Sequence, residues 1–280
     1  MLIDGKQIAS EIFNELKIKV QNLKEKGIIP NLYIILLSND ESSASYVKQK
    51  QLRGEEIGVK ITLEKADPEI STEELISKIN KLNKDYSVHG IIVQRPMPKH
   101  LDEEKIEKTV APEKDVDGFN PTSEFQTPVA MAVLEILRKI SNLKFGIGNL
   151  ELENWLKTKK VTVVGKGLTA GGPIIRSFKK LGIQPEIISS KTRDPKKIIK
   201  ESDIVISAVG KEKVINKSEI KKGAILIGVG MHRGEDKKFH GDYDEDDIKG
   251  TASFYTPVPG GVGPVNVAML LRNLVSAAQP

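Results

Sequence analysis

Hydrophobic residues recur along the chain at two spacings that alternate. In residues 5–26 the apolar side chains Ile8, Ile12, Leu16 and Val20 are four positions apart and share one helical face. The apolar run at 32–37 is short and continuous, which is typical of a buried strand. The same patterns predict helices at 43–57 and at 71–82, the latter capped by Ser71 or Thr72, and strands at 59–63 and 90–94.

The second half of the chain repeats this order of helices and strands. It predicts helices at about 129–140, 172–181 and 265–275, and strands at 161–165, 185–189, 203–210 and 223–230. Alternating strands and helices favour parallel β-α units, so the predicted fold class is α/β. A chain of 280 residues with 39% hydrophobic content is long enough and apolar enough to form two domains.

The amino-acid composition excludes several kinds of partner and of catalytic site. The formal charge is +5, but Lys and Arg are interleaved with Asp and Glu, which argues against nucleic acid and favours mild attraction for anionic ligands. The absence of cysteine excludes disulfides, a cysteine nucleophile and thiolate metal sites. Neither a signal-peptide segment nor an apolar run of membrane-spanning length occurs, so we expect a cytoplasmic protein without membrane contact.

A nine-residue segment at 256–264, TPVPGGVGP, combines three prolines with three glycines. Proline fixes φ, whereas glycine leaves the backbone bare, so the segment is suited to form a rigid wall against a flat ligand. A surface turn or linker is the alternative. Apolar sequence on both sides favours a connection inside a packed domain.

The clearest cofactor signal is VTVVGKGLTAGGP at 161–173, a strand followed by glycines at the start of a helix. Unpaired N–H groups at a helix N-terminus bind phosphate, and glycines let the backbone approach it. The spacing is GxGxxxG rather than GxGxxG. A glycine-rich turn without a ligand is the alternative.

The end of the next strand predicts which dinucleotide binds. An acidic residue there would hold the ribose of NAD, but residues 189–193 read Ser-Ser-Lys-Thr-Arg. These hydroxyls and cations, with Lys166 in the glycine turn, favour NADP over NAD. Glu186 is the competing signal, because a shifted strand end would bring its carboxylate nearer.

Tyr46 and Lys50 are four positions apart on a predicted helix and therefore share a face. A desolvated lysine can act as an acid or base near neutral pH, and a tyrosine ring can stack on an aromatic substrate. A solvated surface lysine is the alternative. Short-chain dehydrogenases also carry a Tyr-xxx-Lys pair, but downstream of the glycine motif, whereas here it lies upstream.

Two further segments follow predicted strands, where ligand sites of α/β proteins form. Gln94 ends one strand, before Pro96, and Asp115 and Asp117 precede a glycine turn in KDVDGFNP at 114–121. Either aspartate could instead only bond to its own turn. The four histidines are scattered, and no stretch has metal-ligand spacing, so we predict no metal.

The ordered set of motifs is specific even though each one is weak. SYVxxK, GIIVQRPMPKH, PEKDVDGFNP, VTVVGKGLTAGGP, SDIVISAVG, GDYD and TPVPGGVGP occur in order over nearly the whole chain. The chain closely resembles the bifunctional methylenetetrahydrofolate dehydrogenase and methenyltetrahydrofolate cyclohydrolase family.

The resemblance implies oxidation of 5,10-methylenetetrahydrofolate with NADP, then hydrolysis to 10-formyltetrahydrofolate. It makes Lys50 the acid or base of hydrolysis, tuned by Gln94, with Asp117 holding the pterin and Tyr46 stacking on the aminobenzoyl ring. These residues bind tetrahydrofolate or take part in catalysis. The resemblance adds Pro259, Gly260 and Gly261 as further residues that lie beside the folate. The cofactor contacts that it implies are Gly165, Lys166, Gly167, Ser190 and Met231.

The resemblance also implies a two-domain organisation and a homodimer. Residues 1–120 form a catalytic folate-binding domain to which the helix at 265–280 returns, residues 121–264 form a Rossmann-like NADP-binding domain, and folate binds between them. Departures from the family pattern are Lys166 and Gly167 for Arg-Ser, residues 126–130 for Cys-Thr-Pro-x-Gly, Gly228 for Asp and Asn266 for Thr. The alternatives are a dehydrogenase-only member, an NADP enzyme with another small substrate, or a non-catalytic nucleotide-binding protein.

Overall fold

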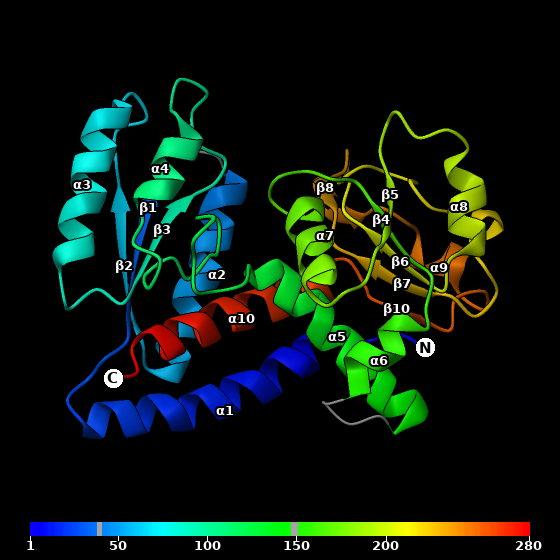
Figure 1. The fold of residues 1–280 in the computed structure, drawn as a ribbon, viewed down its shortest axis with the longest axis horizontal. Helices are drawn as coiled ribbons and strands as arrows, with labels where there is room; N and C mark the ends of the chain where they lie inside the picture. Colours follow the sequence, from blue (N-terminus) through cyan, green and yellow to red (C-terminus); the bar gives the residue numbers. More distant parts are fainter. Residues whose placement is uncertain (38–40, 147–150) are drawn as a thin grey trace. The chain divides into compact units, whose positions relative to one another are not determined.

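The computed structural model describes residues 1–37, 41–146 and 151–280 of the chain. They divide into two compact units, shown in Figure 1. Unit 1 comprises Met1–Ala9 and Val129–Asn266, and unit 2 comprises Ser10–Pro128 and Val267–Pro280. The first nine residues, predicted with the folate-binding domain, thus belong to the other unit. The reason is backbone pairing, because Ile3 N donates to Tyr255 O at 2.8 Å and Tyr255 N donates to Met1 O at 3.1 Å.

Unit 2 is built on a three-stranded parallel sheet in the order β2-β1-β3. Nearly all residues of β1 and β3 are buried, as expected for strands with helices on both faces. A core cluster joins β1 and β3 to α3 and α4, with Ile35, Leu75, Ile79, Val93 and Ile106 among its members. The elements of this half of the chain are α1 (Gly5–Glu25), β1 (Asn31–Leu36), α2 (Glu41–Ile57), β2 (Lys60–Lys65), α3 (Thr72–Lys84), β3 (Gly90–Gln94) and α4 (Glu103–Thr109).

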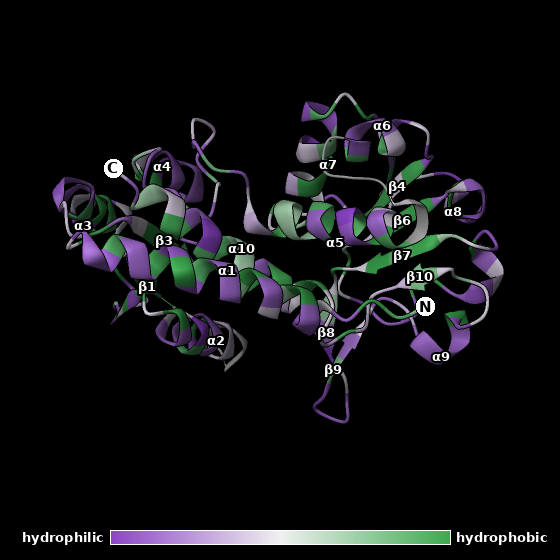
Figure 2. Ribbon diagram, turned by 90° about the horizontal axis from the view of Figure 1, so that it is seen from below, coloured by the Kyte–Doolittle hydropathy of each residue, from purple (hydrophilic) through white to green (hydrophobic). Residues whose placement is uncertain are grey.

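Unit 1 contains a five-stranded sheet in the order β10-β7-β6-β4-β5, with every pair parallel. Strands β4, β6 and β7 are buried along their whole length, and Figure 2 shows β6 and β7 largely in the green of hydrophobic residues. The remaining elements of the chain are α5 (Pro128–Phe145), α6 (Leu152–Lys157), β4 (Val161–Val164), α7 (Gly171–Lys180), β5 (Glu186–Ile188), α8 (Pro195–Glu201), β6 (Ile204–Ser207), the 3-10 helix η2 (Lys217–Glu219), β7 (Ile225–Gly228), the hairpin β8 (Met231–Arg233) and β9 (Phe239–Gly241), α9 (Glu245–Ile248), β10 (Phe254–Tyr255) and α10 (Val262–Ala277).

The predicted α/β class with parallel strands is confirmed, but several element ends differ from the prediction, and for three of them the structure shows the reason. Strand β6 ends at Ser207 instead of 210, because the next backbone amides turn to bond a buried carboxylate. Strand β7 ends at Gly228, because the amides of Val229 and Gly230 both bond Ser207 O. Helix α10 begins at Val262, inside the segment expected to be loop, and Pro264 is tolerated because first-turn amides need no helical acceptor.

In the described part of the chain, no helix combines the length and apolar character needed to cross a membrane.

Candidate active site

Tyr46 and Lys50 lie one turn apart on α2, as their spacing predicts. Lys50 is only 6% exposed, which excludes the alternative of a solvated surface lysine. Tyr46 is partly buried, and this burial raises the pKa of its phenol. The other lysine of α2, Lys48, is exposed, so Lys50 is the one buried lysine of this helix.

Lys50 is bonded to the end of strand β3. Its Nζ donates to Gln94 Oε1 at 2.9 Å, and the amide is oriented by a second bond from Gln94 Nε2 to Arg95 O, also 2.9 Å. Burial lowers the pKa of Lys50, and the negative charge of Asp117 acts in the opposite direction. Lysine is therefore less firmly protonated here than in water, as a general base requires.

The loop after α4 is held in a tight turn by Asp115. This buried carboxylate accepts from the backbone N–H groups of Gly118 at 3.1 Å and Asn120 at 2.8 Å. Gly118 has a φ of +70°, and an added Cβ would lie 2.7 Å from Thr127 N, so the turn requires glycine. Asp115 therefore has the turn-forming role weighed as an alternative, and Asp117 is left to face Lys50.

The carboxyl group of Asp117 is influenced by burial and by two nearby cations. Burial raises the pKa of its carboxyl group, whereas the positive charges of Lys50 and then Arg95 lower it. The same burial raises the pKa of Asp115 to about 6, and the nearby Asp117 charge adds to that shift. The structure thus brings Lys50, Gln94 and Asp117 of the predicted catalytic set together, with Tyr46 one helical turn away.

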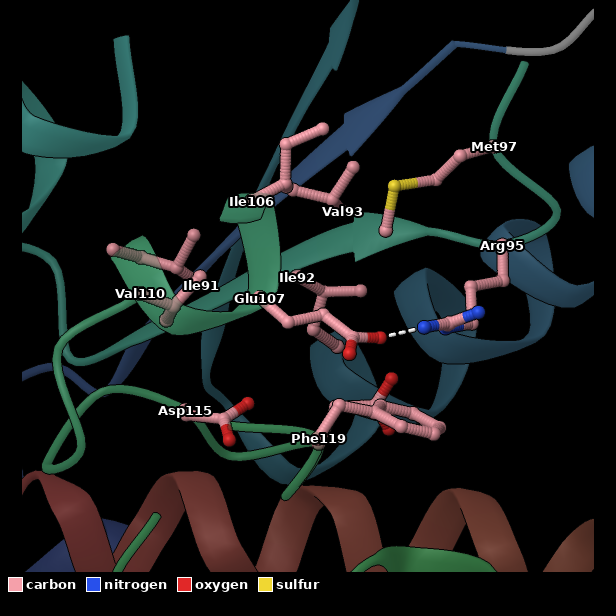
Figure 3. A pocket seen from close by; sticks show the side chains of 11 residues that line it. Ile91, Ile92, Val93, Arg95, Met97, Ile106, Glu107, Val110, Asp115 and Phe119 are labelled. Carbon is pink, nitrogen blue, oxygen red and sulfur yellow. Dashed lines mark ion pairs between the residues drawn. The ribbon is translucent and has the colours of Figure 1, made fainter. Parts of the chain in front are cut away.

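Asp117 also lines a pocket bordered by β3, α4 and residues 115–119 (Figure 3). Its lining is mostly aliphatic, with Arg95, Glu107, Asp115 and Asp117 as the charged members. Arg95 forms an ion pair with Glu107, drawn in Figure 3, and lies over the ring of Phe119, with 4.7 Å from Cζ to the ring centroid. Arg95 was not among the predicted site residues; its position directly after a buried strand was visible in the sequence, but its contacts with Glu107 and Phe119 were not.

In unit 1 a candidate cofactor site lies at the carboxyl ends of β4 and β6. The chain runs from β4 to β5 on one side and then to β6 on the other, which creates the switch point where α/β sheets bind ligands. Helix α7 begins there without a side-chain cap, so the positive end of its dipole lies at this edge of the sheet and favours an anion. An anionic dinucleotide therefore suits this edge of the sheet.

The glycines of this turn lie in different surroundings. A Cβ on Gly165 would lie 2.6 Å from Ala208 O, and one on Gly171 would lie 2.1 Å from Gly165 O, so both are needed for backbone packing. Gly167 has no atom within 4 Å of its added Cβ. Only Gly167 therefore matches the expectation of open space for a phosphate.

The end of β5 carries no carboxylate. Strand β5 begins at Glu186 and ends at Ile188, whose carbonyl accepts from Gly165 N at 2.8 Å, so Glu186 is at the opposite end from the glycine turn. Ser190 and Lys166 are both exposed beyond the ends of their strands. Because the Glu186 carboxylate is not at this end of β5, Ser190 and Lys166 fit a 2′-phosphate.

The loop after β6 is fastened by Asp242, which has no exposed surface. Its carboxylate accepts from Ser207 Oγ at 2.5 Å and from the backbone N–H groups of three successive residues at 2.7 to 3.0 Å, namely Val209, Gly210 and Lys211. Met231, a predicted cofactor contact, lies beside this loop, with its carbonyl 3.2 Å from the Cβ position of Gly210. Sequence reasoning did not select Asp242, since an aspartate within a GDYD string does not reveal its burial.

The proline-glycine segment is closely packed in unit 1. Thr256 is buried and its Oγ1 accepts from Gly228 N at 2.9 Å. A Cβ on Gly261 would lie 2.5 Å from Pro257 O, whereas Gly260 has a φ of +110° and its nearest neighbour is Lys6 Cε at 3.5 Å. The fold therefore has no room for a side chain at Gly261, and substitution there should reduce stability.

Gly228, where the family often has Asp, is explained by the same packing. Its Cβ position is 3.0 Å from Val258 Cγ2 and 3.1 Å from the Tyr243 hydroxyl. The Tyr243 ring fills the space, and its hydroxyl donates to Thr256 O at 2.7 Å. Burial raises the pKa of Tyr243 well above its ordinary value, so the group remains a neutral donor.

Comparison with protein families gives two matches. The model described as tetrahydrofolate dehydrogenase/cyclohydrolase, catalytic domain, matches residues 3–117. The model described as tetrahydrofolate dehydrogenase/cyclohydrolase, NAD(P)-binding domain, matches residues 148–280. The first match contains Tyr46, Lys50, Gln94 and Asp117, and the second contains the glycine turn at 165–172.

Individual relatives match over their full length. The bifunctional protein FolD of Lactococcus lactis subsp. cremoris strain MG1363 is 37% identical over 99% of this chain and 96% of its own. A crystal structure of bifunctional FolD from Campylobacter jejuni has a TM-score of 0.91 and 34% identity, covering 99% of this chain and 98% of that one. The Trypanosoma brucei enzyme, solved with NADP cofactor and inhibitor, has a TM-score of 0.89 and 30% identity, covering 99% and 96%.

Proposed function

The chain belongs to the tetrahydrofolate dehydrogenase/cyclohydrolase family, and from this premise we propose which of its residues carry the two reactions. It is a bifunctional one-carbon folate enzyme that oxidises 5,10-methylenetetrahydrofolate to the 5,10-methenyl form with NADP and then hydrolyses that product to 10-formyltetrahydrofolate. When bound, NADP accepts the hydride that leaves the methylene carbon. The remaining chemistry is proton transfer and binding by the chain itself.

Hydrolysis requires a group that removes a proton from water and returns one to the substrate. The water oxygen bonds to the methenyl carbon and loses both of its protons as the formyl carbonyl forms, the bond from that carbon to N5 breaks, and N5 takes up one proton while the other passes to solvent. We assign both transfers to Lys50, whose burial lowers its pKa and whose Nζ is held 2.9 Å from Gln94 Oε1. The methenyl cation would also disfavour a charged lysine beside it. This buried Lys50–Gln94 pair is the observation that carries the proposal.

Folate binding is assigned to Asp117, to Tyr46 and to three residues of the proline-glycine segment. Asp117 would hold the pterin, because its carboxylate can accept hydrogen bonds from the N–H groups of the ring. Tyr46 would stack on the aminobenzoyl ring from its position one turn before Lys50. Pro259, Gly260 and Gly261 would line the folate, and their role rests on the family resemblance.

The cofactor is assigned to the glycine turn and the end of β5. The uncapped start of α7 and the open face of Gly167 would receive the pyrophosphate. Lys166 and Ser190 would bind the 2′-phosphate, while Gly165 and Met231 would shape the site from adjacent loops. Assembly as a homodimer, which the family resemblance implies, and a cytoplasmic location complete the proposal.

A spectrophotometric assay tests the assignment. Methylenetetrahydrofolate and NADP should give NADPH, while methenyl absorbance rises only briefly and then decays to the 10-formyl product. Methenyl absorbance that persists would indicate a dehydrogenase without cyclohydrolase activity, which is the main alternative. Failure to form NADPH would count against the dehydrogenase assignment itself.

A further inference from the structure

Arg95 lies next to Gln94 and lines the same pocket of unit 2 as Asp117. It directly follows Gln94, the last residue of β3, and its side chain is only 14% exposed. Two carboxylates of α4 fix the guanidinium, since Nη1 lies 2.8 Å from Glu103 Oε2 and Nη2 pairs with Glu107. A planar guanidinium held by two carboxylates has one defined orientation.

The face of that guanidinium covers the ring of Phe119 at 4.7 Å. Phe119 is two positions after Asp117, in the same turn that Asp115 closes through Gly118 and Asn120. A cation above an aromatic ring at this distance is attracted to the ring. The stack therefore connects α4, through Arg95, to the loop that carries Asp117.

Arg95 also acts on Asp117 through charge. Burial raises the pKa of Asp117, and Arg95 and Lys50 are the cations that lower it. The charged groups around Asp117 are Lys50 from α2, Arg95 after β3 and Asp115 on its own loop, while Glu103 and Glu107 of α4 face Arg95. Loss of Arg95 would leave Lys50 as the main charge favouring the Asp117 carboxylate.

We propose that Arg95 is a positioning residue for folate binding, which fixes the Asp117 loop by stacking on Phe119 and helps keep the Asp117 carboxylate ionised. This inference rests on the proposed function, in which Asp117 holds the pterin. Arg95 acts through Phe119 and Asp117, and it needs no contact with the substrate.

The test compares kcat and KM for methylenetetrahydrofolate in the full-length wild-type enzyme and in Arg95→Met, Arg95→Lys and the control Lys108→Met. Lys108 is an exposed lysine of α4 that pairs with Glu104, so its loss removes the same charge without touching the loop. We expect Arg95→Met to raise KM for the folate about tenfold, to lower kcat less than threefold and to leave KM for NADP unchanged. Its acid limb of kcat/KM should move to higher pH, since Asp117 would bind a proton more readily. Arg95→Lys should keep the acid limb but still raise KM about threefold.

A purely structural role would lower the melting temperature without changing the folate KM or the pH profile. A folate KM within twofold of wild type in Arg95→Met, with an unshifted acid limb, would overturn the proposal. If Arg95→Met does not fold, a wild-type KM in Arg95→Lys would overturn it, and a raised KM would support it. An inactive wild-type enzyme would overturn the proposed function and this inference together, whereas an active wild type with unaffected variants would overturn this inference alone.

Discussion

Replacing Lys50 with methionine separates chemistry from folding. Methionine has a similar length and no charge, so the variant removes the proton-transfer group while filling most of the space. We expect cyclohydrolase activity to fall by about 10² to 10⁴, the usual contribution of a positioned acid or base. Lys48→Met is the matched control, because Lys48 is an exposed lysine on the same helix.

The fold should survive because two effects on stability oppose each other. Loss of the bond to Gln94 leaves a partly buried amide oxygen unpaired, at a cost of about 1 to 3 kcal/mol. Loss of the buried ammonium group removes a desolvation penalty, which burial reveals as a lowered pKa. Because the two contributions oppose each other, the melting temperature should change by only a few degrees.

The lowered pKa also predicts a pH signature. In the pH range between the folded-state pKa of Lys50 and its higher unfolded value, the unfolded chain binds more protons than the folded one. The contribution of Lys50 to the free energy of unfolding therefore rises with pH across that range. Lys50→Met should lack this rise, which denaturant unfolding at a series of alkaline pH values would detect.

The assay follows methenyltetrahydrofolate absorbance directly, so hydrolysis is measured without the dehydrogenase step. Persistent absorbance with Lys50→Met, normal decay with Lys48→Met and cooperative unfolding of both variants would support the assignment. Hydrolysis by Lys50→Met at the wild-type rate would refute it. Slow hydrolysis accompanied by a broad, non-cooperative unfolding transition would instead show that the lysine is needed for folding.

Three further predictions concern unit 1. Gly261→Ala should lower the melting temperature by several degrees, since overpacking costs about 1 to 3 kcal/mol, whereas Gly263→Ala, with no atom within 4 Å of its Cβ, should leave thermal unfolding unchanged or slightly raise its midpoint. Asp242→Asn should weaken NADPH binding in a fluorescence titration by roughly tenfold, because a donor NH2 group replaces an acceptor of several backbone N–H bonds; unchanged affinity would show that this loop does not shape the cofactor site. Ser190→Asp should lower kcat/KM for NADP more than for NAD, and an unaltered ratio would exclude Ser190 from 2′-phosphate recognition.

Helices and strands could be predicted from the sequence where their buried residues recur at a regular spacing. The apolar runs at 32–37 and 90–94 became the buried strands β1 and β3, and the four-residue spacing in 5–26 became α1. Helix α4 was not predicted, because seven mostly charged residues with one buried side chain, Ile106, show no periodicity. Yet α4 supplies both carboxylates that hold Arg95.

Site residues could be predicted from the sequence only where a single helix, or the end of a single strand, brings them into place. Spacing alone placed Tyr46 and Lys50 together, whereas the roles of Arg95 and Asp242 depend on contacts between distant segments. A single sequence contains no signal for such contacts. The closeness of Gly261 to Pro257 O is similarly a matter of backbone path, and composition suggested open space instead.

The two bonds from Asn273 of α10 to the loop around Asp117 have a consequence for synthesis on the ribosome. Its Nδ2 donates to Val116 O at 2.9 Å and to Gln126 O at 3.0 Å, and Asn273 is 157 residues after Val116. At about 5 to 20 residues per second, the loop leaves the synthesis site roughly 10 to 30 s before its anchor is made. The loop around Asp117 is synthesised long before its anchor, and it reaches its final form only after Asn273 has been made.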